Sequence, residues 1–153
     1  GEVFLNKPIP GEKVVIAGGG LTGCEAALHL AQEGKKVTVI DMLSENELNA
    51  SEPPILRRGT GLMDLLEQNG VRFITEVKLE EIVEKGVIVI DKAWHRFEIP
   101  ADALILSFGF KARSAVAAAL QDSAPDVYTI GDCRSPNRIK EAVHDGFNIA
   151  VEI

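Results

Sequence analysis

The feature that most constrains the fold is a glycine cluster placed between a predicted strand and a predicted helix. Residues 13–17 form a short β-branched run, which predicts a buried strand. The sequence GGGLTG follows at residues 18–23, and apolar residues then recur at helical spacing until Gly34 ends the pattern. Residues 36–40 predict a second strand. This order of elements predicts a right-handed crossover between two parallel strands.

The glycine spacing matches the G-x-G-x-x-G pattern of dinucleotide-binding turns. We expect Gly18 to permit the tight turn and Gly20 to let a pyrophosphate approach the backbone. Gly23 should let the helix and the strand pack closely. Leu21 and Thr22 complete the loop, and the N–H groups at the helix start should receive the phosphate charge.

An acidic residue, Asp41, ends the second predicted strand. A carboxylate at this position is expected to accept hydrogen bonds from the adenosine ribose hydroxyls. It would also repel a 2′-phosphate, and residues 42–48 contain no Lys or Arg to offset that repulsion. The pattern therefore favours NAD(H) over NADP(H). Arg57 and Arg58 leave the choice open, because they could fold back onto a phosphate or simply begin a solvated helix.

The remaining elements complete an α/β fold, which we expect to be a Rossmann-like three-layer parallel sheet with an antiparallel β-meander crossover. We expect Trp94 and Phe97 to lie in the core of that meander. Further elements are a surface loop at 42–54, a helix at 56–69, a strand at 71–74, meander strands at 76–84, 86–91 and 94–99, a strand at 102–106, a helix at 114–120, a strand at 127–130 and a helix from about 138.

Composition excludes several classes of protein. The 153 residues are 46% hydrophobic, enough for a core, and the net charge of −7 argues against a nucleic-acid or anionic-membrane surface. Two cysteines are too few for a disulfide framework or a four-cysteine iron–sulfur cluster, and the three histidines show no metal-binding spacing. Without a membrane-length apolar run or a secretory leader, we expect a cytoplasmic protein with no metal site.

These motifs carry a family resemblance. Residues 14–27 and 36–43, and the segment VYTIGDC at 127–133, resemble the NAD(P)H-binding region of pyridine nucleotide–disulfide reductase-like flavoproteins. With the tail at 138–147, they look like the C-terminal part of the NADH:flavin oxidoreductases. That group includes 2-enoate reductase, 2,4-dienoyl-CoA reductase and trimethylamine dehydrogenase.

The resemblance implies a division of the chain. Residues 1–113 would be the NAD(P)H-binding domain, and residues 114–153 would complete an FAD-binding half in a larger parent protein. Gly131 and Asp132 would then contact FAD, and Gly109 would contact the nicotinamide nucleotide. The loop after Gly109 lacks the Pro-Asn that often follows in relatives, which leaves that contact open.

The glycine motif alone fits FAD as well as NAD(H), because FAD motifs also end their second strand with an acid. Glu25 favours NAD(H), since Gly-x-Glu resembles the nicotinamide-nucleotide half of the family, although it could equally be an unpaired surface residue.

We therefore expect this chain to position NADH for hydride transfer to FAD or FMN and onward reduction of an enoate- or enoyl-type substrate. The expected partners are the FAD and barrel domains missing from the chain, so the isolated chain should be inactive. The alternatives are an ADP- or NAD-binding module with no catalysis, the FAD-binding half, and a piece that binds nothing. The apolar tail should add beside residues 104–106 as a fifth strand or pair with a second copy.

Overall fold

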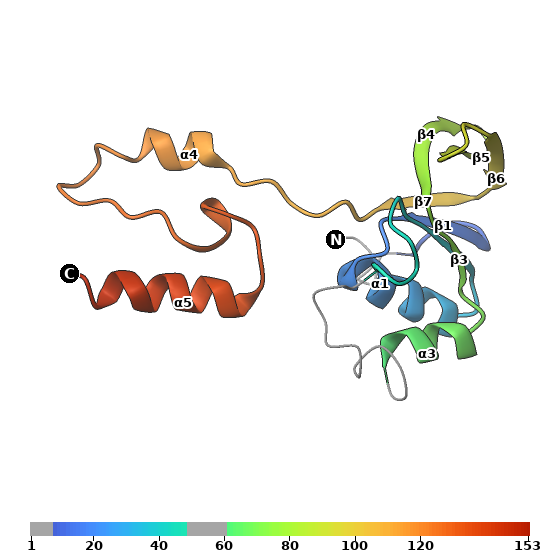
Figure 1. The fold of residues 1–153 in the computed structure, drawn as a ribbon, viewed down its shortest axis with the longest axis horizontal. Coiled ribbons are helices and arrows are strands. Elements are labelled where there is room, and N and C mark those ends of the chain that lie inside the picture. Colours follow the sequence, from blue (N-terminus) through green and yellow to red (C-terminus); the bar gives the residue numbers. More distant parts are fainter. Residues whose placement is uncertain (1–7, 49–60) are drawn as a thin grey trace. The chain divides into compact units, whose positions relative to one another are not determined.

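A computed structural model describes residues 8–48 and 61–153 of the chain. These residues form two compact units, one ending at Phe108 and the other running from Gly109 to Ile153 (Figure 1). Each unit is described by itself below. Arg57, Arg58 and the predicted loop at 49–54 lie outside the described residues.

The first unit is built on a four-stranded parallel sheet. Its order is β3-β2-β1-β7, and the strands are β1 (Lys13–Ala17), β2 (Lys36–Ile40), β3 (Arg72–Ile74) and β7 (Ala103–Leu106). The strand β1 is central and, apart from Lys13, fully buried. Its β-branched composition follows from this place, because a parallel strand between two covering layers has no polar face.

Alternate residues of β1 pack against different layers. Val14 and Ile16 pack with the helices α1 (Leu21–Gln32) and α3 (Leu62–Gln68). Val15 and Ala17 pack against an antiparallel meander on the opposite face. The meander has the order β4-β5-β6 and consists of β4 (Val77–Val83), β5 (Gly86–Asp91) and β6 (Arg96–Pro100). Figure 1 shows α1 and α3 on one side of the sheet and the meander on the other. The expected three-layer α/β fold with a meander crossover is therefore confirmed.

Most predicted elements of the first unit are present, within a residue or two at their ends. The helix predicted at 56–69 is described only from residue 61, where α3 begins at Leu62. The prediction that Trp94 and Phe97 lie in the core is wrong, since they are 82% and 39% exposed. Trp94 lies in the turn between β5 and β6 with a φ of +67°. Asp91 fixes that turn by accepting hydrogen bonds from the N–H groups of Ala93 and His95.

The second unit contains α4 (Ser114–Ala119), a 3-10 turn η2 (Gly131–Cys133) and α5 (Ile139–Ala150). The strand predicted at 127–130 is wrong, because residues 109–153 contain no strand. The fifth-strand placement beside residues 104–106 would join the two units, each of which is described by itself, so it stays a prediction. An apolar run becomes a strand only when another strand supplies its hydrogen bonds, and this segment has none within its unit.

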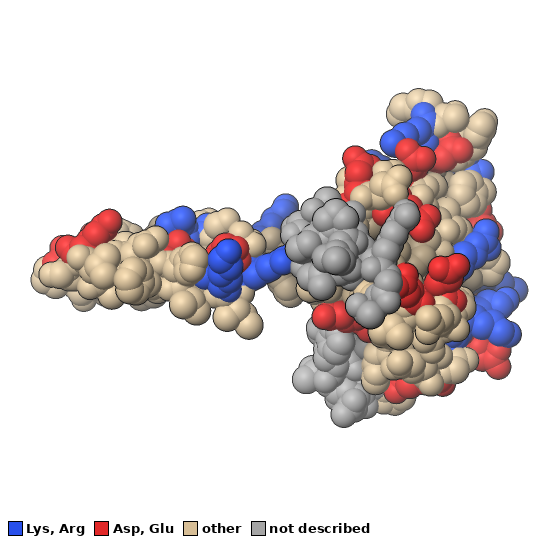
Figure 2. All heavy atoms as spheres, turned by 60° about the horizontal axis from the view of Figure 1, so that its bottom comes forward, with Lys and Arg blue, Asp and Glu red and all other residues tan. Residues whose placement is uncertain are grey.

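Although residues 109–153 are all described, none of them is buried. One face of α5 exposes Ile139, Val143 and Phe147, at 84%, 62% and 66%. On the face of this unit seen in Figure 2, most of the surface belongs to uncharged residues. The unit thus has apolar side chains without a core of its own. Pairing of the tail with a second copy stays a prediction. No helix in the described parts is long and apolar enough to cross a membrane.

Candidate functional site

The glycine loop joins β1 to α1 at the carboxyl edge of the parallel sheet. Gly18 has a φ of +111°, and its N–H donates to the carbonyl oxygen of Ile40 at 2.9 Å. A Cβ on Gly18 would lie 2.3 Å from the carbonyl oxygen of Ser107. Both the backbone angle and the close approach of a neighbouring chain segment therefore require glycine here.

Gly20 and Gly23 differ sharply in the space around them. A Cβ on Gly23 would lie 2.0 Å from the carbonyl oxygen of Gly18, so α1 sits directly against the loop. A Cβ on Gly20 would meet nothing within 4 Å. Gly20 is exposed and has a φ of −65°, which any residue can adopt. No contact or backbone angle within the described protein requires glycine at this position. Its missing side chain leaves open space beside the backbone.

The open space lies at the N-terminus of a twelve-residue helix. Gly20 is the N-cap, and no side chain caps the helix. The first intrahelical bond is donated by the N–H of Cys24 to the carbonyl oxygen of Gly20 at 2.9 Å. The preceding N–H groups, which belong to Leu21, Thr22 and Gly23, have no acceptor within the helix. An anion placed above Gly20 would meet these donors and the positive end of the helix dipole.

Asp41 is tied directly to the glycine loop. Its Oδ2 accepts a hydrogen bond from the N–H of Gly19 at 2.6 Å, and its Oδ1 accepts one from the N–H of Leu43 at 2.8 Å. The side chain of Leu48, which is buried, packs over Gly19. A carboxylate has about four acceptor positions, so two remain for a ligand's hydroxyl groups. The N–H of Gly19 is therefore already hydrogen-bonded within the protein.

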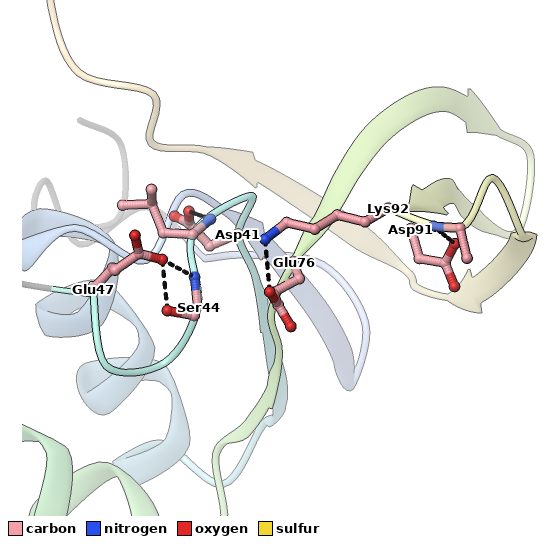
Figure 3. A network of polar contacts seen from close by, with 8 residues as sticks. Asp41, Ser44, Glu47, Glu76, Asp91 and Lys92 are labelled. Carbon is pink, nitrogen blue, oxygen red and sulfur yellow. Dashed lines mark hydrogen bonds and ion pairs between the residues drawn. The ribbon is translucent and has the colours of Figure 1, made fainter.

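The segment after β2 is acidic and ordered by local hydrogen bonds (Figure 3). The N–H and hydroxyl of Ser44 donate to Oε2 of Glu47 at 2.9 and 2.5 Å. These hydrogen bonds lower the pKa of Glu47, so its charge is retained at neutral pH. Glu76 lies beside this segment, and its carboxylate accepts a hydrogen bond from Nζ of Lys92 at 2.7 Å. The surroundings of Asp41 are therefore mainly negative.

The second unit holds the other predicted cofactor contacts. Gly131 has a φ of +60°, and its N–H donates to Oδ2 of Asp145 at 3.1 Å. Asp145 also pairs with Arg134, at 3.4 Å between the charged atoms. Asp132 accepts a hydrogen bond from the N–H of Asn137 at 3.2 Å. These contacts fix the turn before α5 and leave Asp132 with further acceptor positions.

The structure brings part of the predicted set together. Gly18, Gly20, Leu21, Thr22, Gly23 and Asp41 surround one loop in the first unit. Glu25 is an exposed residue of the first turns of α1. Gly109, Gly131 and Asp132 belong to the second unit, and Gly109 has a φ of +83°. The cofactor contacts expected of these residues stay predictions.

Sequence reasoning did not find the contacts of Ser107, Leu48 and Lys92. The close approach of the Ser107 carbonyl to Gly18 depends on β7 lying beside β1, which joins distant parts of the chain. The approach of Lys92 depends on how the meander folds over the sheet. No local pattern signals either contact. The acidity of residues 45 and 47 was visible in the sequence and could have extended the argument made for Asp41.

This strand–glycine loop–helix arrangement can be compared with known proteins. Residues 2–146 match the family described as pyridine nucleotide-disulphide oxidoreductase. The chain belongs to this family. It is 34% identical over its whole length to an NADH oxidase of Thermoanaerobacter brockii and 28% identical over 99% of its length to a cinnamate reductase of Clostridium sporogenes. The chain spans only 23% of the length of each of these relatives.

Solved structures agree with the fold. A 2-naphthoyl-CoA reductase, in complex with 2-naphthoyl-CoA, matches 99% of this chain with a TM-score of 0.83 and 30% identity. The match covers 23% of that protein's chain. Thioredoxin reductase of T. acidophilum matches 98% of this chain and 53% of its own, with a TM-score of 0.73 and 22% identity. At that identity the second likeness concerns the fold alone.

Proposed function

We propose that the chain binds NAD(H) at the glycine loop and, within a larger flavoprotein, positions it for hydride transfer to a flavin. The open backbone at Gly20 is the observation that carries this proposal. Glycine there serves no packing or conformational need of the described protein, whereas it lets a pyrophosphate reach the N-terminus of α1. The family match and the likeness to an NADH oxidase support the same cofactor.

Each residue of the loop has a separate task in this proposal. The N–H groups of Leu21, Thr22 and Gly23 would bind the pyrophosphate, and Asp41 would accept hydrogen bonds from the adenosine ribose. Asp41 would also hold the loop in its binding shape through Gly19. Glu25 would lie toward the nicotinamide end. The bound nucleotide supplies the hydride, and the protein groups only bind and orient it.

The acidic surroundings of Asp41 support a preference for NAD(H) over NADP(H). A 2′-phosphate at the ribose would stand close to the Asp41 carboxylate and to the ordered segment that carries Glu47. Residues 42–48 offer no cation in exchange. Repulsion between the 2′-phosphate and these carboxylates disfavours NADP(H) binding, and this repulsion should weaken as salt is added.

The second unit supports a role for FAD in the parent protein. Its residues are all at least partly exposed, and the apolar face of α5 lacks a covering layer within the unit. We propose that an FAD-binding half of the same parent covers this face, with Gly131 and Asp132 against the FAD. The fraction of the relatives that this chain spans leaves ample length for such a half and for a substrate domain.

The names of two relatives suggest the substrate class. One is a cinnamate reductase and another a 2-naphthoyl-CoA reductase, both of which act on conjugated carbon frameworks. We propose that the parent passes electrons from NADH through the flavin to an activated alkene or related enoyl-type substrate. The residues that would bind that substrate belong to the parent's other domains.

Calorimetric titration of this chain with NADH, NADPH, FAD and ADP tests the proposal. We expect NADH to bind and Asp41→Ala to weaken it about 10- to 100-fold, because hydrogen bonds to a charged group contribute about 1.5–3 kcal/mol. The same variant should improve NADPH relative to NADH. Tighter binding of FAD than of NADH would instead assign the loop to the FAD half.

Two further outcomes separate the alternatives. Binding of ADP and NADH with equal affinity would indicate a module that recognises only the adenosine diphosphate part. Absence of all binding would refute the proposal for the isolated chain. Glu98→Gln, which removes an exposed carboxylate from β6, is a control away from the loop and should leave NADH binding unchanged.

A further inference from the structure

Glu76 lies next to the segment that begins at Asp41. Its N–H donates to the carbonyl oxygen of Leu43 at 3.1 Å, and the N–H of Val77 donates to the carbonyl oxygen of Asp41 at 2.9 Å. These bonds extend the pairing of β2 with β3 past the ends of both strands. Glu76 has a φ of +60°, an uncommon angle for a residue other than glycine. These backbone contacts place Glu76 directly beside the segment that begins at Asp41.

Lys92 reaches Glu76 from the hairpin between β5 and β6. Figure 3 shows its side chain extended from the hairpin toward Glu76, which lies in the connection between β3 and β4. The Nζ to Oε1 distance is 2.7 Å. The hydrogen bond and the charge of Glu76, with a smaller contribution from Glu47, raise the pKa of Lys92. The lysine therefore stays protonated at neutral pH, with Glu76 as its direct partner.

The pair lines a cavity of about 310 Å³ together with Met42, the residue that directly follows Asp41. Lys78 and Glu80 line the same cavity. Through Met42, the cavity therefore adjoins the segment that begins at Asp41, where we place the adenosine ribose. A 2′-phosphate on the ribose near Asp41 would approach the acidic segment that follows Asp41. Lys92 is the cation beside that segment, and Glu76 already binds it.

We propose that Glu76 is a specificity-determining residue that excludes NADP(H) by holding Lys92 in an ion pair. This inference rests on the proposed binding of NAD(H) at the glycine loop. Glu76 acts in two ways: its own charge repels a 2′-phosphate, and its hydrogen bond occupies the lysine that could bind one. Glu76, from the connection between β3 and β4, then adds a further acidic determinant to Asp41 and the segment that follows it.

Because both side chains of the Glu76–Lys92 pair are exposed, the ion pair can be removed by substitution at little cost to stability. The side chains of Lys92 and Glu76 are 68% and 51% exposed, and ion pairs this exposed contribute little to stability. Removal of the Glu76 carboxylate should therefore leave the fold intact and free Lys92 for another anion. A phosphate dianion would be a stronger partner for a lysine than a neutral amide.

Calorimetric titration of the chain with NADH and NADPH tests the inference through Glu76→Gln and its combinations. We expect Glu76→Gln to tighten NADPH binding about fivefold and to leave NADH binding within about twofold, in line with one exposed ion pair. The double variant Glu76→Gln, Lys92→Met should lose that gain. A double variant with Lys78→Met, a lysine of the same cavity, should keep it. Glu98→Gln alone, which removes an exposed carboxylate from β6, should not produce it.

The outcomes separate this inference from the proposed function. If the unaltered chain binds no NADH, the proposed function fails and the inference fails with it. If NADH binds but Glu76→Gln leaves the NADPH to NADH ratio unchanged, only the inference is refuted. A gain that persists without Lys92 would also refute it, because the effect would then come from net charge alone. Thermal unfolding of each variant confirms that the affinities refer to folded protein.

Discussion

Substitution of Gly20 by alanine separates the needs of the fold from those of the proposed ligand. The added methyl group would meet no atom within 4 Å, and the φ of −65° at Gly20 suits alanine. The folded state should lose only the modest advantage that glycine has over alanine at an N-cap, while the unfolded chain loses conformational freedom. Because these two effects oppose each other, we expect the free energy of unfolding to change by less than about 1 kcal/mol in either direction.

The same methyl group would occupy the space in which we place the pyrophosphate. If it displaces the phosphate from even one N–H donor of α1, about 1.5–3 kcal/mol of binding is lost, or about 10- to 100-fold in affinity. Urea unfolding followed by circular dichroism measures the first effect, and calorimetric titration with NADH measures the second. A Gly20→Ala chain that binds NADH as tightly as the unaltered chain would falsify the placement of the pyrophosphate over Gly20.

Gly23→Ala is the matched contrast in the same loop. Alanine is favoured over glycine in helices by about 1 kcal/mol, so propensity alone predicts a gain. The structure predicts a loss, because the methyl group would lie 2.0 Å from the carbonyl oxygen of Gly18. That carbonyl is backbone, and the loop around it is fixed by hydrogen bonds from Gly18 and Gly19. We expect a net destabilisation of about 1–3 kcal/mol. Increased stability would contradict this packing.

Two further predictions concern stability away from the loop. Leu66→Ala should lower the free energy of unfolding, measured by urea titration, by about 2–5 kcal/mol, because the Leu66 side chain is fully buried in the core between the helices and the sheet. Leu65→Ala should lower it far less, because the Leu65 side chain is 42% exposed. The N–H groups of Lys13 and Glu12 donate to the Asp102 carboxylate and lower its pKa. The stability that Asp102 contributes should therefore be present above about pH 4 and be lost as the pH falls through the lowered pKa. Urea unfolding at a series of pH values should show a smaller acid-side loss in Asp102→Asn; an unchanged pH profile would contradict the assignment.

Local patterns were sufficient to predict most of the first unit. The β-branched runs of β1 and β2 predict buried strands because a strand covered on both faces has little place for polar side chains. The positive φ angles at Gly18 and Gly34 have glycine in the sequence for the same local reason. The alternation of apolar residues within the meander predicted its antiparallel strands. These properties depend on neighbours along the chain.

The predictions for Trp94 and for residues 127–130 failed where local pattern was not enough. An aromatic residue in an alternating segment suggests a core position, but the hydrogen bonds of Asp91 place Trp94 in an exposed turn. The run at 127–130 has strand composition and lacks a partner strand in its unit. Whether an apolar segment becomes a strand depends on what lies beside it, and composition does not contain that information.

The candidate site likewise has one part that the local sequence predicts and one part that it does not. By itself the sequence determined the glycine loop, the helix that follows it and the acid at the end of β2, because each depends on a few consecutive residues. Only the tertiary structure decided that Asp41 holds the loop through Gly19 and that Ser107 closes against Gly18. It also decided that Glu76, paired with Lys92, lies beside the segment that begins at Asp41. Those contacts join residues far apart in the chain, and the packing of the sheet and the meander fixes them.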